Sequence, residues 1–157
     1  MSIKNAIINA PVHFIEKKFL NEGDNIAIIR YQGEEYHGAA SCHEDDEDFY
    51  SDKIGKTIAH MRAMKNAMIA ERDNAKRDWK TLKHAYDNAM QNIPMEKRLN
   101  CHEDNFLMAV YKAENRYKKY SNYVKEINKE IISYLNDQNK VIDFLKRKRA
   151  LEKANLN

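Results

Sequence analysis

The sequence predicts an α+β fold that is mostly α: a short N-terminal helix, a β-hairpin and a long antiparallel helical hairpin of the coiled-coil type. Three observations lead to this prediction. A β-branched run occupies residues 26–29, two sustained heptad patterns follow residue 53, and only four glycines and two prolines interrupt 157 residues. We expect residues 1–53 to hold the first helix, the β-hairpin and an acidic segment, and residues 54–157 to form the helical hairpin.

The first expected element is a short helix within "NAPVHFIEKKFLNEGD". Pro11 suits the first turn of a helix, and Gly23 is a typical residue after the last turn. Val12, Ile15 and Phe19 would share one face of this helix, so the expected role is packing against the rest of the protein.

The next segment, "NIAIIRYQGEEYHGAASC", changes to strand character. Residues 26–29 form one strand, residues 32–34 a turn, and residues 36–42 a returning strand of small residues. Two strands alone are only marginally stable in water, so they need cover from a helix or from another subunit. We therefore expect a homo-oligomer.

Two heptad patterns predict the long helices, roughly over residues 54–92 and 103–149. Alternating steps of four and three residues give the first seam: Ile54, Ile58, Met61, Lys65, Met68, Arg72, Ala75, Trp79, Leu82, Tyr86, Ala89 and Ile93. The second seam is Phe106, Val110, Ala113, Tyr117, Tyr120, Val124, Ile127, Ile131, Tyr134, Gln138, Val141 and Leu145. With a short connection at Pro94, the two helices should fold back on each other, at about 57 and 70 Å in length.

The tetrapeptide "CHED" occurs twice and contains both cysteines, Cys42 and Cys101. The first long helix separates the copies by about 55 Å, whereas one metal ion needs ligands at about 2 Å. The two copies therefore cannot share an ion within one chain, and we expect no metal and no cofactor. A site between subunits stays open, as does the role of the two thiols, which should be reduced in a cytosolic protein.

Charge is distributed unevenly along the chain. Residues 26–53 carry two basic and eight acidic residues, residues 54–93 eight basic and four acidic, and residues 94–157 fourteen basic and nine acidic. The acids just before the first long helix suit the positive end of its dipole. The basic second half allows an anionic partner, but a net charge of +3 is too small to require nucleic acid.

No motif for catalysis is present: the chain has no Gly-rich phosphate loop, no nucleophile elbow and no His-Glu-x-x-His. We therefore expect a protein that is not an enzyme and has no catalytic residues. No apolar run of about 18 residues predicts a membrane span, and the start lacks the apolar core of a signal peptide. The expected location is the cytoplasm.

The candidate binding residues for an anionic ligand or partner are Arg30, Lys56, His60, Arg62, Lys65, Arg72, Tyr111 and Tyr123. Lys65 and Arg72 interrupt the first seam, either as polar residues that set the helix register or as a cationic ledge. Tyr111 and Tyr123 lie off the second seam, where aromatic side chains can anchor an interface. The run "KRKR" at residues 146–149 suits a helix C-terminus and can also contact phosphates.

The stretch "YQGEEYHGAASCHEDDEDFYSDKIGKTIAHMRA", residues 31–63, resembles small proteins of phages that infect low-GC Gram-positive bacteria. The shared pattern is a hairpin that ends in small residues and Cys, an acidic segment, and Gly-x-x-Ile-Ala and Arg-Ala at the start of a helix. In outline the expected architecture is also similar to the Thoeris anti-defence protein 1 family, which are oligomeric sponges for signalling nucleotides, and to anti-CRISPR proteins. No ligand-binding residue is carried over from these families.

The resemblance implies counter-defence, and three functions remain open. The first is a protein that binds and neutralises a host immune component, such as a CRISPR effector. The second is an oligomeric sponge for a cyclic-nucleotide signal, and the third is a nucleic-acid-binding protein that uses its basic helices. If the protein is phage-encoded, it would act in the host cytoplasm.

Overall fold

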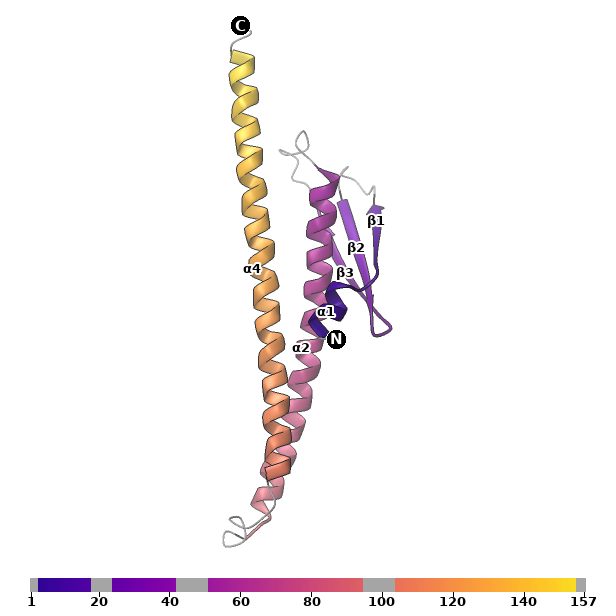
Figure 1. The fold of residues 1–157 in the computed structure, drawn as a ribbon, viewed down its shortest axis with the longest axis vertical. Coiled ribbons are helices and arrows are strands. Elements are labelled where there is room, and N and C mark those ends of the chain that lie inside the picture. The colour runs from indigo at the N-terminus through magenta and orange to yellow at the C-terminus, as the bar shows by residue number, and fades with distance from the viewer. Residues whose placement is uncertain (1–2, 18–23, 42–50, 95–103, 155–157) are drawn as a thin grey trace. The chain divides into compact units, whose positions relative to one another are not determined.

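The structure, a computed structural model, describes residues 3–17, 24–41, 51–94 and 104–154 (Figure 1). The elements are α1 (Ile3–Ile8), β1 (Val12–Lys17), β2 (Asp24–Tyr31), β3 (Glu34–Ala40), α2 (Asp52–Gln91) and α4 (Asp104–Ala154). The predicted fold class is confirmed: the protein is mostly helical, with a short N-terminal helix, an antiparallel sheet and a long helical pair.

The chain groups into two compact units, which we describe separately. Residues 1–67 and 125–157 form unit 1, which holds the sheet, α1, the start of α2 and the second part of α4. Residues 68–124 form unit 2, which holds the second part of α2 and the first part of α4. The division predicted between residues 53 and 54 stays a prediction.

The segment predicted as the N-terminal helix is a strand, and the short helix lies earlier, at α1. β1 pairs antiparallel with β2, from Val12 opposite Ile29 to Lys17 opposite Asp24, and the sheet order is β1-β2-β3. The prediction was wrong because it considered only the local spacing of apolar residues. Pairing with β2, a partner elsewhere in the chain, overrides a weak helical period. Phe19 and Gly23 lie outside the described residues.

The predicted hairpin is confirmed between β2 and β3, whose strands pair from Asn25 opposite Ala40 to Tyr31 opposite Glu34. Its turn consists of Gln32 and Gly33, with φ of 53° and 84°. Positive φ at both central residues is the requirement of a two-residue type I′ turn, which matches the twist of the strands. The Gln32 amide donates to the Tyr31 hydroxyl at 2.9 Å.

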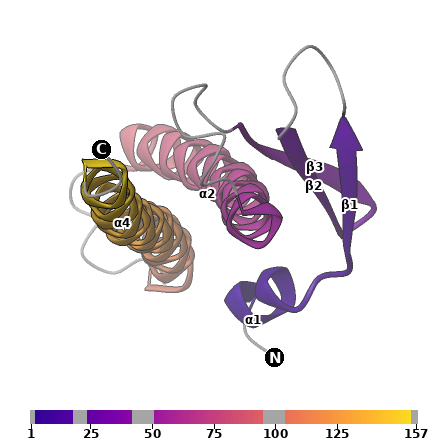
Figure 2. The same ribbon diagram turned by 90° about the horizontal axis from the view of Figure 1, so that it is seen from above.

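The sheet and α2 approach each other within unit 1 through small residues (Figure 2). Gly55, Ala59, Ala63 and Ala67, each four residues after the last, are all buried in α2. Opposite them, a Cβ added to Gly38 of β3 would lie 2.1 Å from the Ala59 carbonyl oxygen and 2.3 Å from the Ala63 nitrogen. Backbone therefore packs directly on backbone, which is possible only because Gly38 has no side chain.

Side chains of α2 also protect the edge of the sheet. β3 is an edge strand, and the carbonyl oxygen of Ala39 accepts a hydrogen bond from the Arg62 guanidinium. The carbonyl oxygen of His37 accepts another from the Asn66 amide at 2.7 Å. Covering an edge in this way reduces the tendency of a strand to pair with another chain.

The helical pair confirms the first heptad seam and the second as far as Gln138, and the helix bounds lie close to those predicted. Every predicted seam position of α2 is buried or half-buried, and so is every position of the second seam as far as Gln138. In unit 2 the ring of Trp79 stacks on that of Tyr117 and the ring of Tyr86 meets Phe106, each pair with centroids 5.6 Å apart. The later residue of α2, Tyr86, contacts the earlier residue of α4, Phe106, so the two helices run antiparallel.

We predict that Gly38→Ala lowers the free energy of unfolding by about 3 kcal/mol, because strand and helix must move apart to admit a methyl group. Urea denaturation followed by circular dichroism measures this change. Ala39→Ser, at an exposed position of the same strand, is the matched control and should change stability by less than about 0.5 kcal/mol. Equal midpoints for the Gly38 variant and the wild type would show that the close approach is absent.

Candidate binding surfaces

Two of the predicted binding residues in unit 1 form ion pairs within their own part of the fold. The Arg30 Nε donates to the Glu35 Oε1 at 2.7 Å, across the hairpin. The Lys56 Nζ lies 2.7 Å from the Asp52 Oδ2, one turn earlier in α2. Such solvent-exposed pairs contribute little to stability, but each places an acid beside a cation that was predicted to meet an anionic ligand.

Of the other three predicted residues of unit 1, Arg62 and Lys65 also serve the fold. Arg62 binds the Ala39 carbonyl at the sheet edge, and the Lys65 Nζ donates to the Asn128 Oδ1 of α4 at 2.7 Å. The second contact agrees with the register-setting interpretation of Lys65. Burial lowers the pKa of His60 below its ordinary value, which favours the neutral imidazole over the cation that an anion would bind.

The remaining predicted residues lie in unit 2. The Arg72 Nε donates to the Asp73 Oδ1 at 2.9 Å. The Tyr123 ring meets the Tyr120 ring edge-on, with centroids 6.0 Å apart, whereas the Tyr111 side chain is half exposed. The eight predicted residues therefore fall into two units, and most of them engage partners within the fold.

Unit 2 contains an aromatic stack flanked by lysines, which the sequence analysis did not identify. The rings of Trp79 and Tyr117 are almost parallel, at 8°. The Lys76 Nζ lies 5.9 Å from the Tyr117 ring centroid, and the Lys83 Nζ lies 5.9 Å from that of Trp79. The negative face of each ring attracts the ammonium group, which holds each lysine beside the stack.

Lys80 adds a third cation to this face of α2. Lys76, Lys80 and Lys83 follow each other at spacings of four and three residues, so they share one side of the helix. Among the described residues, none of the three forms an ion pair with an acid. Lys76 and Lys80 border a hollow of about 660 Å³, which is also lined by Ala70, Asp73, Asn74 and Arg77. The spacing alone would have revealed this row in the sequence.

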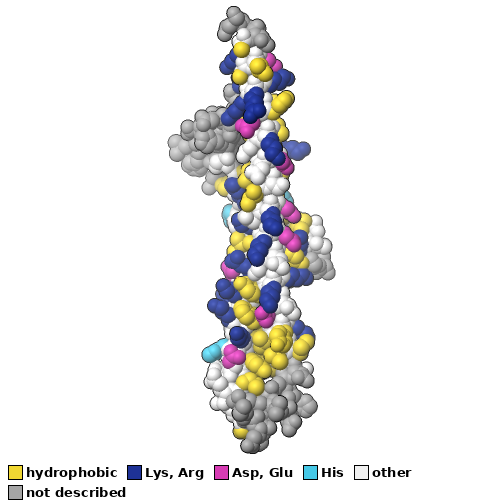
Figure 3. Space-filling view, turned by 90° about the vertical axis from the view of Figure 1, so that its left-hand side faces the viewer, with side chains coloured by type: hydrophobic (Ala, Val, Ile, Leu, Met, Phe, Trp, Pro, Cys, Tyr) yellow, Lys and Arg dark blue, Asp and Glu magenta, His cyan; other side chains and the backbone are white. Residues whose placement is uncertain are grey.

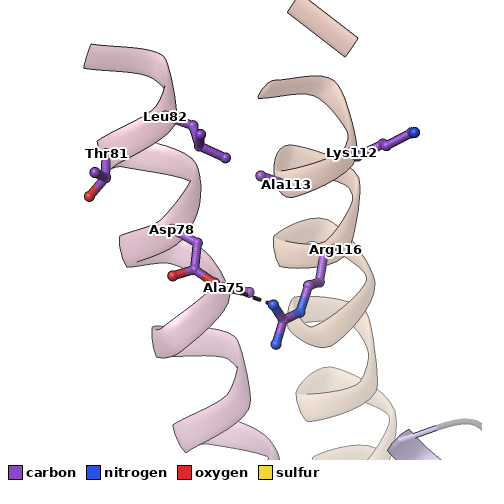
Figure 4. A pocket seen from close by; sticks show the side chains of 7 residues that line it. All are labelled: Ala75, Asp78, Thr81, Leu82, Lys112, Ala113 and Arg116. Carbon is purple, nitrogen blue, oxygen red and sulfur yellow. Dashed lines mark hydrogen bonds and ion pairs between the residues drawn. The ribbon is translucent and has the colours of Figure 1, made fainter. Parts of the chain in front are cut away.

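A second hollow, of about 460 Å³, lies between the helices of unit 2 (Figure 4). It is lined by Ala75, Asp78, Thr81, Leu82, Lys112, Ala113 and Arg116. Ala75 and Ala113 are seam positions with small side chains, so the seam leaves space at this level. The lining combines the apolar side chains of Ala75, Leu82 and Ala113 with an acid, Asp78, and two basic residues, Lys112 and Arg116.

Arg116 connects this groove to a buried acid. Its guanidinium lies 3.3 Å from Asp78 and 3.5 Å from Glu71, whose side chains are 57% and 4% exposed. Burial raises the pKa of Tyr120; the hydrogen bond from Arg116 opposes this rise, and the negative charge of Glu71 adds to it. Because a buried carboxylate is costly without a cation, the main role of Arg116 is to compensate Glu71.

Neither a metal site nor a membrane span is found in the part of the chain that the structure describes. No group of three His, Cys, Asp or Glu side chains there is arranged to hold a metal ion. None of the described helices has the length and apolar character needed to cross a bilayer. Residues 42–48, with the first "CHED" copy, and Cys101, His102 and Glu103 of the second copy lie outside the described residues, whereas Asp104 begins α4.

Comparison with known proteins finds no family model, no curated protein and no solved structure that matches this chain. The function therefore has to be inferred from the residues and surfaces described above. Those surfaces are open faces and grooves of helices, and they carry both basic and apolar side chains.

We predict that Arg116→Met lowers the free energy of unfolding by about 2 kcal/mol, because Glu71 is left buried without its cation. Asp78→Asn removes only the exposed partner of Arg116 and should cost less than about 0.5 kcal/mol. Adding Glu71→Leu to Arg116→Met should restore most of the loss, since no buried charge remains. Additive effects of the two changes, measured by urea denaturation, would contradict this coupling.

Proposed function

We propose that the protein acts by binding rather than by catalysis, and that it neutralises a protein of a host immune system, such as a CRISPR effector. The outward surface of α4 supports this proposal. Apart from Ile8, the exposed large apolar side chains of the described residues all belong to α4: Met108, Tyr111, Ile132, Val141, Phe144, Leu145 and Leu151. Exposed apolar side chains at this density favour an interaction surface.

Basic side chains accompany these apolar residues along α4. Figure 3 shows hydrophobic and basic side chains interspersed on one face of the molecule. Over Asp104–Ala154 the helix carries twelve basic and seven acidic residues. Protein interfaces combine apolar anchors, among which Tyr and Met are enriched, with a polar rim, and Met108 and Tyr111 are both half exposed.

The similarity of residues 31–63 to small phage proteins supports the setting of counter-defence in the host cytoplasm. A protein target is favoured over a nucleotide, because both hollows of unit 2 are open, whereas small-ligand sites bury most of the ligand surface. The oligomeric sponge remains the alternative. The homo-oligomer stays a prediction. The hairpin was expected to need cover from a helix or from another subunit, and within this chain β1 pairs with β2 and α2 packs against β3.

Co-purification from host cells tests the proposal. The tagged protein should retain one specific host protein, and replacing Met108 and Tyr111 together by Ser should reduce the retained amount at least about tenfold by removing apolar contact area. Asn122→Ser, an exposed change on the same helix, is the control and should retain the partner fully. Retention of a compound that absorbs near 260 nm, without a host protein, would favour the sponge instead.

Nucleic-acid binding is a second candidate function, and the row of Lys76, Lys80 and Lys83 favours it. Three cations on one helix face, beside the half-buried stack of Trp79 and Tyr117, suit the phosphate backbone of a nucleic acid. Their lack of ion pairs to described acids leaves the charge available to a polyanion.

We predict that the protein binds a labelled single strand of about 20 nucleotides at about 50 mM salt, as measured by fluorescence anisotropy. Replacing Lys76, Lys80 and Lys83 by Gln should weaken binding and make the slope of log K against log salt about 2 units less steep. Lys140→Gln, on α4 of unit 1, is the control. Absence of binding at low salt, or a triple variant that binds like the wild type, would remove this candidate.

A further inference from the structure

α4 extends beyond the start of α2. The Lys65 Nζ donates to the Asn128 Oδ1 at 2.7 Å, which sets the register of the antiparallel helices in unit 1. α2 begins at Asp52, thirteen residues before Lys65, and thirteen residues beyond Asn128 is Val141. α4 continues to Ala154, so residues 141–154 form an overhang of about 20 Å that has no α2 residue opposite it.

The heptad seam continues into this overhang. Ile127 and Ile131 are 5% and 6% exposed, where α2 lies opposite them. Val141 and Leu145, the last two seam positions, are 52% and 38% exposed. The same apolar stripe therefore changes from buried to exposed at the point where its partner helix ends.

Two further apolar side chains widen the exposed stripe. Phe144 and Leu151 are 66% and 65% exposed, and at about 100° per residue they lie on the same side of α4 as Val141 and Leu145. The stripe spans about 120° of the helix surface, the width that an amphipathic helix normally buries. Lys148 interrupts the stripe, and its Nζ lies 3.9 Å from Glu152.

The overhang is strongly basic. It carries five basic residues, Lys146, Arg147, Lys148, Arg149 and Lys153, against Asp143 and Glu152. The helix dipole accounts for Lys153, which lies in the last turn, but its effect falls off within one turn and does not reach residues 146–149. A second copy of the overhang would bring the same positive charge, so charge complementarity favours an acidic occupant.

We propose that residues 141–154 bind an acidic amphipathic helix of the partner protein, which takes the place that α2 leaves vacant along α4. Apolar side chains of the incoming helix pack on Val141, Phe144, Leu145 and Leu151, and its acids face the flanking cations. This inference rests on the proposed function, because it identifies the part of the target that meets this end of α4.

The test uses the full-length protein and a synthetic helical peptide of about three heptads, with Leu at the core positions and Glu at the flanking ones. Fluorescence anisotropy of the labelled peptide should report binding that weakens as salt rises. Replacing Phe144 and Leu151 together by Ser should weaken the binding at least about tenfold. Asn139→Ser is the control, since Asn139 is exposed on α4 but lies outside the stripe, and it should bind like the wild type.

Several results would overturn this inference. The double variant binding like the wild type would do so, and so would equal binding of a peptide with Lys in place of Glu. Suppose that the wild type binds vesicles of anionic lipid, that the double variant does not, and that the peptide fails to bind. The overhang would then be assigned to a membrane surface. A dimer in light scattering that the double variant abolishes would assign it to a second copy.

The failure of this inference is distinguishable from failure of the proposed function. If host cells yield a retained protein that depends on Met108 and Tyr111 but the acidic peptide does not bind, only the overhang inference fails. If no host protein is retained at all, the proposed function fails.

Discussion

Direct contact between the backbones of β3 and α2 is the constraint on which the rest of the structure depends. Gly38 has no Cβ, and Ala59 and Ala63 present only methyl groups, so strand and helix pack at a distance that larger residues would prevent. This contact covers one face of the sheet and leaves the heptad seam of α2 directed toward α4. One helix thus serves two layers, because its small residues and its large apolar residues lie on different sides.

Because α2 packs against both the sheet and α4, its polar residues bind partners on both sides. Arg62 and Asn66 bind carbonyl groups at the sheet edge, and Lys65 binds Asn128 across the helical pair. Arg62 and Lys65 looked like candidate ligand contacts because their charge is visible in the sequence, whereas their partners Ala39 and Asn128 come from distant parts of the chain. Lys76, Lys80 and Lys83 of α2, in contrast, form no ion pair with an acid among the described residues.

Much of the fold could be predicted because heptads and turn chemistry are local signals. The bounds of both long helices and the hairpin at Gly33 follow from them. The strand at residues 12–17 could not be recognised, since its partner β2 decides its conformation. Glu71 was missed because it lies one position before the seam residue Arg72, and only the structure shows that α4 covers it and supplies Arg116.

The way unit 1 is assembled has a consequence for how the chain folds during synthesis. The sheet and the start of α2 contain mostly local contacts, which form quickly. The seam of α2 in this unit, however, is covered by the part of α4 that follows Lys125, which emerges from the ribosome only after all of unit 2 has been made. Until Ile127 and Ile131 arrive, the nascent chain exposes an apolar helix face, so this interval is when it is most open to chaperones and to aggregation.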